Sequence, residues 1–217
     1  LYSDHGQLRD FEAPTVEPYL DERAHDTFHV AHLTEDDFRD QRQRGVIGMV
    51  PGEIITTDNG YAEHVDLEKD ILKIAVIERH KQTGHIGIGY IQGYGLKSGA
   101  VATSISHDSH NIIVVGTNSK DMAAAANYIV EHHGGIVVVE NGEVKASVVL
   151  EIAGIMSDRP LTAVNTELEA AKDAAFKLGV SRGIDPFMTL SFMALPVIPT
   201  LRITTRGVVD VVTQQYV

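Results

Sequence analysis

The chain has 217 residues, of which 43% are hydrophobic and 22% are charged, a composition typical of a globular protein with one good core. Its 18 Lys and Arg residues against 30 Asp and Glu residues give a net charge of −12, so we expect neither nucleic acid nor a membrane as a partner. Without cysteine the chain has no disulfide or thiolate chemistry, and no apolar run approaches the roughly 20 residues that span a bilayer. A cytoplasmic location fits these features.

Residues 1–37 differ from the rest of the chain. They are rich in Asp, Glu, Arg and His and include Pro14 and Pro18. Such a stretch buries too little apolar surface to fold alone, so we expect an acidic arm that packs against another body, ahead of a domain over residues 38–217. The chain opens with Leu1 and no signal peptide, which indicates a fragment or a processed chain.

The first half of the domain is β-like. Residues 46–50, 53–57 and 72–79 are short apolar or β-branched runs and predict strands, with a turn at Asp58-Asn59-Gly60. The glycine-rich residues 84–99 do not fit the dinucleotide-binding spacing, and we expect strands that pack closely there.

The second half mixes strands and helices. Strands are expected over residues 100–106 and 112–116, and Asn141-Gly142 between residues 136–140 and 144–150 predicts a β-hairpin. Ala-rich residues 122–133, which end at Gly134, and residues 162–178 predict two main helices. Short final strands are expected over residues 201–204 and 208–212. The fold class is therefore α+β, with mixed β-sheet layers and two main helices.

Six polar residues stand in a row between two apolar strands: Ser106-His107-Asp108-Ser109-His110-Asn111. They form either a turn whose side chains satisfy one another or a functional site at a sheet end, because unpaired polar groups are costly in a buried strand. His107, Asp108 and His110 are candidates for acid–base chemistry or metal binding. Strand alternation would place His107 and Ser109 on one side and Asp108 and His110 on the other.

Glu78 and His80 form a second candidate. Alternation places them on one face of the strand end, opposite Arg79. A buried ion pair or a solvated strand end explains this pattern equally well. The chain has no GxSxG, P-loop or HExxH motif.

Several segments in the same order resemble the C-terminal domain of bacterial-type adenine deaminases of the amidohydrolase superfamily. The resemblance extends over roughly residues 38–212. The segments that carry it are residues 74–80 (IAVIERH), 83–87 (TGHIG), 93–100 (GYGLKSGA), 106–111 (SHDSHN), 114–118 (VVGTN), 152–158 (IAGIMSD), 185–192 (DPFMTLSF) and 195–199 (LPVIP). The chain departs from the family pattern at His133-Gly134-Gly135, at Ile155 and at Thr205, where an acidic residue is usual.

The resemblance implies a metal-dependent hydrolysis of adenine to hypoxanthine and ammonia, in purine salvage or catabolism. In that family a divalent metal, iron or manganese, is held on a preceding (β/α)8 barrel whose ligands include an HxH pair. This chain has no HxH and no room for a barrel, so we expect it to bind no metal itself and to be inactive alone. Its expected partners are adenine, the barrel domain and further copies of the same protein.

The resemblance also implies a place for the polar run. We expect residues 106–111 to face the barrel mouth, with His107, Asp108 and His110 as catalytic groups and Ser106, Asn111, Glu78 and His80 near the substrate. Two alternatives stay open: a free-standing metal-binding hydrolase that uses His107, Asp108 and His110, and a non-catalytic oligomerisation domain.

Overall fold

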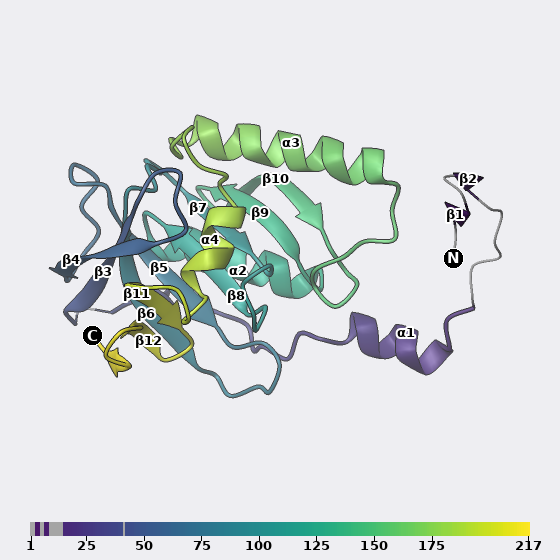
Figure 1. The fold of residues 1–217 in the computed structure, drawn as a ribbon, viewed down its shortest axis with the longest axis horizontal. Coiled ribbons are helices and arrows are strands. Elements are labelled where there is room, and N and C mark those ends of the chain that lie inside the picture. Colours follow the sequence, from purple (N-terminus) through teal and green to yellow (C-terminus); the bar gives the residue numbers. More distant parts are fainter. Residues whose placement is uncertain (1–2, 5–6, 9–14, 41) are drawn as a thin grey trace.

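An eight-stranded mixed sheet forms the centre of the computed structural model, which describes residues 3–4, 7–8, 15–40 and 42–217 (Figure 1). Across the sheet the order is β10-β9-β7-β8-β5-β6-β3-β4, with β3 and β6 parallel and the other neighbours antiparallel. Its strands are β3 (Arg44–Met49), β4 (Thr56–Ala62), β5 (Ile71–Ile77), β6 (Ile86–Gln92), β7 (Ala100–Thr103), β8 (Ile112–Gly116), β9 (Gly135–Glu140) and β10 (Glu143–Val149).

Helices and a small sheet surround this centre. The predicted α+β class is confirmed, and the described residues contain no (β/α)8 barrel. None of the described helices is long and apolar enough to cross a bilayer. The remaining elements are β1 (Ser3–Asp4), β2 (Gln7–Leu8), α1 (Pro18–His25), the 3-10 helix η1 (Glu35–Phe38), α2 (Ser119–Glu131), α3 (Leu161–Lys177), α4 (Met188–Met193), β11 (Leu201–Thr204), β12 (Gly207–Asp210) and β13 (Gln215–Tyr216).

Both faces of the large sheet are covered, which explains why its middle strands are apolar along their whole length. In β5, Leu72, Ile74 and Val76 point into one core with α3, α4 and the β11–β12 hairpin, while Ala75 and Ile77 point into the other with α2 and η1. The alternation follows from the two-residue period of a strand. Each fully buried aliphatic side chain contributes roughly 1.5–3 kcal/mol to stability.

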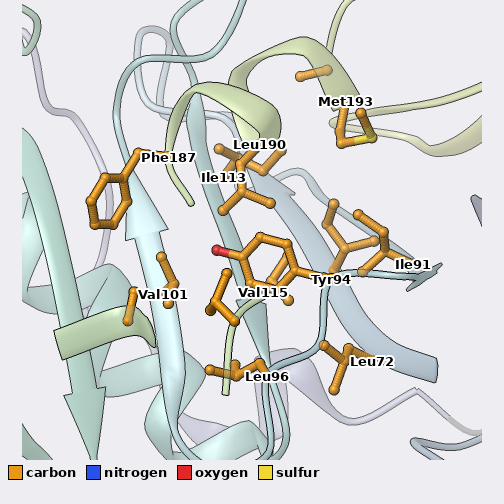
Figure 2. Packing of buried hydrophobic residues seen from close by; sticks show 14 of the residues in the cluster. Leu72, Ile91, Tyr94, Leu96, Val101, Ile113, Val115, Phe187, Leu190 and Met193 are labelled. Carbon is orange, nitrogen blue, oxygen red and sulfur yellow. The ribbon is translucent and has the colours of Figure 1, made fainter. Parts of the chain in front are cut away.

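Tyr94 ties α4 to the sheet. Its ring is fully buried among side chains of β5, β7 and β8, and Figure 2 shows it beside Leu190 of α4. Its hydroxyl donates to the carbonyl of Pro186 at 2.8 Å, just ahead of the helix. Asp185 also accepts from the N–H of Phe187 and of Met188. These contacts fix a six-residue helix that the sequence analysis did not predict, because it is too short to show a period.

The predicted hairpin and the two main helices are confirmed. Asn141 and Gly142 have φ angles of 56° and 79°, the left-handed values that a two-residue hairpin turn requires. Helix α2 begins after Asn118, whose side chain accepts from the N–H of Asp121 at 2.8 Å, and α3 is 17 residues long.

The close packing predicted for the glycine-rich stretch is also confirmed. A side chain at Gly87 would collide with the backbone of Thr204, and one at Gly89 with the side chain of Val208. The β11–β12 hairpin therefore lies directly on β6, which brings residues 203–205 to the large sheet.

The predicted turn at Asp58-Asn59-Gly60 is wrong. These residues lie inside β4, where the pairing skips from Gly45↔Tyr61 to Ile47↔Asp58, so β4 has one extra residue. Gly60 has a φ of 80°. An Asn-Gly pair suits a β-bulge as well as a turn, and here it forms the bulge.

The arm packs on the domain over part of its length. Leu33 of the arm is buried against α2, as is Phe38 at the start of the domain, and Asn127 of α2 bonds both the N–H and the carbonyl of Leu33. Helix α1 has no buried residue and lies at the periphery (Figure 1). A division of the chain at residues 37 and 38 stays a prediction.

Candidate functional site

The 106–111 loop joins β7 to β8, two adjacent antiparallel strands of the large sheet. The N–H of His110 donates to the carbonyl of Ser106 at 2.6 Å and closes a five-residue turn. The N–H of His107 donates to the carbonyl of Ser191 in α4 at 3.1 Å. The loop is therefore held by its own turn and by the helix that Tyr94 anchors.

The turn brings the two imidazoles together. The ring centres of His107 and His110 lie 5.8 Å apart in an edge-on arrangement, and the His107 ring lies 5.0 Å from that of Phe192. The predicted strand alternation is wrong at this point, because residues 107–109 form a turn and His110 has a left-handed φ of 49°, so the run is not an extended strand.

The surroundings of His110 favour the neutral form of its imidazole. Burial lowers its pKa, and the charges of His107 and Arg79 lower it further, while Asp108 opposes them. The N–H of Ser106 donates to its Nδ1 at 3.2 Å, which places the ring proton on Nε2.

A pocket of about 370 Å³ lies beside the loop. Asp108, Ser109 and Asn111 line one part of it, and residues 195–197 and 203–205 line most of the rest. The Asp108 carboxylate is exposed and has no hydrogen-bond partner among the described residues. It is therefore the free charged group that the loop offers to the pocket, whereas neither imidazole is part of the lining.

Asn111 and Ser106 serve the loop itself. The Asn111 carboxamide accepts from the N–H of Arg79 at 3.2 Å and donates to the Ser109 hydroxyl at 3.0 Å. Ser106 is buried, and its hydroxyl finds no partner in the described part of the chain. Asn111 reaches the pocket wall, but its polar atoms already have partners.

The side chains of Glu78 and His80 bond different parts of the structure. His80 Nε2 donates to the carbonyl of Ser109 at 2.6 Å and so joins the loop. The Glu78 carboxylate instead accepts from the N–H groups of His80, Lys81 and Thr83 in its own turn. Burial opposes its ionisation, but these bonds outweigh that effect and lower its pKa to about 2. Glu78 lines a different pocket, together with residues 29–33.

Arg79 is the neighbour of the loop that the sequence analysis missed. Its side chain is buried and its Nε donates to the carbonyl of His110. The available signal was strand alternation, which places Arg79 on the face opposite Glu78 and His80 at the end of an apolar strand.

No group of three or more His, Asp or Glu side chains stands ready to hold a metal ion in the ranges that the structure describes. The polar run therefore brings together two imidazoles, a free carboxylate and a pocket. These groups can accept protons or bind the polar edge of a small molecule.

The family described as "Adenine deaminase C-terminal domain" matches residues 52–215. The chain belongs to this family. It is similar to the adenine deaminase of Brucella anthropi (48% identity over 189 residues, 82% of this chain) and to that of Bacillus subtilis (45% over 197 residues, 86% of this chain). It is also similar to adenine deaminase 2 of Carboxydothermus hydrogenoformans (47% over 176 residues, 77% of this chain). The aligned part is 33%, 34% and 31% of these relatives, so the chain spans about a third of their length.

Proposed function

We propose that this chain is the C-terminal part of an adenine deaminase, which hydrolyses adenine to hypoxanthine and ammonia in purine salvage or catabolism. The observation that supports this proposal most strongly is identity of 45–48% over most of the chain to proteins of that name. The two alternative functions are not favoured, because these relatives are enzymes about three times as long.

The proposed reaction needs a divalent metal, iron or manganese. The side chains of this chain do not fit such a metal. The described residues offer no ligand set for it. We therefore assign the metal to a preceding (β/α)8 barrel, in the two thirds of the relatives' length that the chain does not match. The contribution of this chain is then limited to binding, orienting and shielding adenine and to moving protons.

The 106–111 loop and its pocket are the groups that we place at the barrel mouth. The Asp108 carboxylate can accept a hydrogen bond from the exocyclic amine of adenine or receive a proton during hydrolysis. The apolar wall of residues 195–197 can cover the flat face of the purine and exclude water. His107 and His110, whose ring centres lie 5.8 Å apart in the same turn, are the other groups of the loop that can carry protons.

The same proposal covers the location and the oligomeric state of the complete protein. We infer a cytoplasmic enzyme that forms homo-oligomers. Apolar side chains that are about half exposed support a further interface, among them Ile54, Ile55 and Met188 around one pocket beside α4. Light scattering of the full-length protein tests the oligomer, and a monomer at working concentration would contradict it.

Alanine replacement of His107 and of Asp108 in a full-length protein that carries this chain tests the role of the loop. We expect kcat/KM for adenine to fall by roughly 10²-fold or more for Asp108→Ala and by a smaller factor for His107→Ala. Asp173→Ala, which removes an exposed acid of α3 that is not part of the pocket lining, is the matched control. Unchanged kcat/KM in both loop variants would contradict the proposal.

A further inference from the structure

Arg79 is a buried cation that carbonyl groups, not carboxylates, hold in place. It is 2% exposed. Its Nη1 donates to the carbonyl and the hydroxyl of Thr27 at 2.7 and 2.9 Å, its Nη2 to the carbonyl of Ala153 at 2.9 Å, and its Nε to the carbonyl of His110. The ring of Phe28 stacks 4.2 Å from the guanidinium carbon. No carboxylate bonds it within the described ranges.

Such an arrangement is costly for stability alone. A buried cation with no bonded carboxylate loses its hydration, and burial lowers the pKa of Arg79 to about 10, although the charge of Glu78 opposes this shift. The side chain still carries its proton at neutral pH. Only a guanidinium has donors that point in several fixed directions within one plane, and here they reach three segments that are far apart in sequence.

The three segments include both the arm and the candidate loop. Thr27 and Phe28 belong to the arm, and Ala153 lies in the turn between β10 and α3. The loop is held twice, by Nε at the His110 carbonyl and by the backbone N–H at the Asn111 carboxamide. Gly154 permits this packing, because a side chain there would meet both Phe28 and the guanidinium.

We propose that Arg79 is a positioning residue that sets the geometry of the 106–111 loop and makes it depend on the docking of arm residues 27–28. The catalytic consequence rests on the proposed function, in which the arm leads back to the barrel. When the arm docks, the Arg79 side chain then couples the barrel to the 106–111 loop, which faces the barrel.

Arg202 provides a matched control. It too is fully buried and held by carbonyls, with Nε donating to Ile198 at 2.8 Å and Nη2 to Ile54, and burial lowers its pKa to about 10. Its hydrogen bonds within the described part of the chain, however, reach no residue of the 106–111 loop. A Lys at either position keeps the charge and loses the fork of donors.

The readout is the titration of His110 in the 217-residue chain, followed by NMR of its ring, with a His110→Gln variant to assign the signal among 11 histidines. Besides Arg79, the groups that influence this ring are His107, Asp108 and His80. In Arg79→Lys we expect the His110 pKa to rise toward its ordinary value, because the freed loop relieves its burial. In Arg202→Lys we expect a comparable loss of Tm and an unchanged His110 titration.

Phe28→Leu provides a milder second variant, which keeps an apolar side chain and removes the stacked ring. We expect it to move the His110 titration in the same direction by a smaller amount. An unchanged His110 titration in both Arg79→Lys and Phe28→Leu would overturn the proposal, as would an equal shift in Arg202→Lys.

Activity adds a separate readout. In the full-length protein Arg79→Lys should lower kcat/KM for adenine by roughly tenfold or more, as supporting residues around active sites typically do. If His107→Ala and Asp108→Ala leave kcat/KM unchanged, the proposed function fails, whereas the His110 titration still decides whether Arg79 positions the loop.

Discussion

Two connections between neighbouring antiparallel strands differ in what determines their shape. The β9–β10 turn consists of Asn141 and Gly142, whose left-handed conformations are those that this residue pair favours. The carboxylate of Asp121 in α2 accepts from both of their N–H groups, at 3.3 and 2.7 Å. The β7–β8 connection takes its shape from distant groups: Ser191 of α4, His80 and Arg79. The hairpin turn takes its conformation from its own residue pair and has one outside anchor, Asp121, whereas the polar loop is held by three outside groups, which indicates that its geometry matters beyond the fold.

Removing the Asn111 side chain should break the support of the loop. Asn111→Ala leaves the buried N–H of Arg79 without its acceptor, so we expect the free energy of unfolding to fall by about 1–3 kcal/mol. Denaturant titration measures this loss. In the hairpin, Asn141→Ala should cost at most about 1 kcal/mol, since only its left-handed backbone disfavours Ala. Equal losses would remove the contrast between the two connections.

Lowering the pH should weaken the turn at residues 78–83, which the Glu78 carboxylate holds together. The pKa of Glu78 is about 2 in the folded chain against an ordinary 4.5, so its contribution to stability is present above pH 4.5 and is lost as the pH falls toward 2. We expect Glu78→Gln to lower the free energy of unfolding at pH 7 by roughly 1–2 kcal/mol. This is the value for hydrogen bonds to a charged group, reduced because the Glu78 side chain is partly exposed to solvent.

The difference between wild type and Glu78→Gln should shrink as the pH falls below about 4.5. Denaturant titrations at pH 7, 5, 4 and 3 follow it. Glu143→Gln, at the exposed start of β10, is the control and should show little pH dependence. A wild-type advantage that stays constant down to pH 3 would refute the role given to the Glu78 carboxylate.

Substitution in the β9–β10 hairpin should lower the stability of the protein without changing its activity. Gly142→Ala meets no neighbouring atom closer than 3.9 Å, so its cost comes from the φ of 79°. We expect a loss of about 1 kcal/mol in the free energy of unfolding, measured by thermal or chemical denaturation. A loss of several kcal/mol would mean that the substitution also breaks the hydrogen bonds from the turn to Asp121.

The sequence analysis succeeded where local pattern decides the structure. Asn141-Gly142, the Ala-rich residues 122–133 and the β-branched strands each predict their own conformation, and the family resemblance that the comparisons confirm also came from local motifs. It failed at Asp58-Asn59-Gly60, where a bulge and a turn share one signature, and at α4, whose six residues are fixed by Tyr94 and Asp185.

The candidate site was only partly predictable for the same reason. Residues 106–111 were recognised from their composition, but the pairing of His107 with His110 depends on one hydrogen bond from His110 to Ser106. Glu78 and His80 were placed together by alternation, yet β5 ends at Ile77 and their side chains serve different groups. Arg79 could not be assigned, because its three partners are 31 to 74 residues away in the chain.

The most direct test of the account compares Asp108→Ala with Gly142→Ala in the full-length protein, measuring both kcat/KM for adenine and Tm. The account predicts that Asp108→Ala loses roughly 10²-fold or more in kcat/KM and keeps its Tm, while Gly142→Ala loses Tm and keeps its kcat/KM. An Asp108→Ala protein with wild-type kcat/KM would contradict the central claim that this loop takes part in the deamination of adenine.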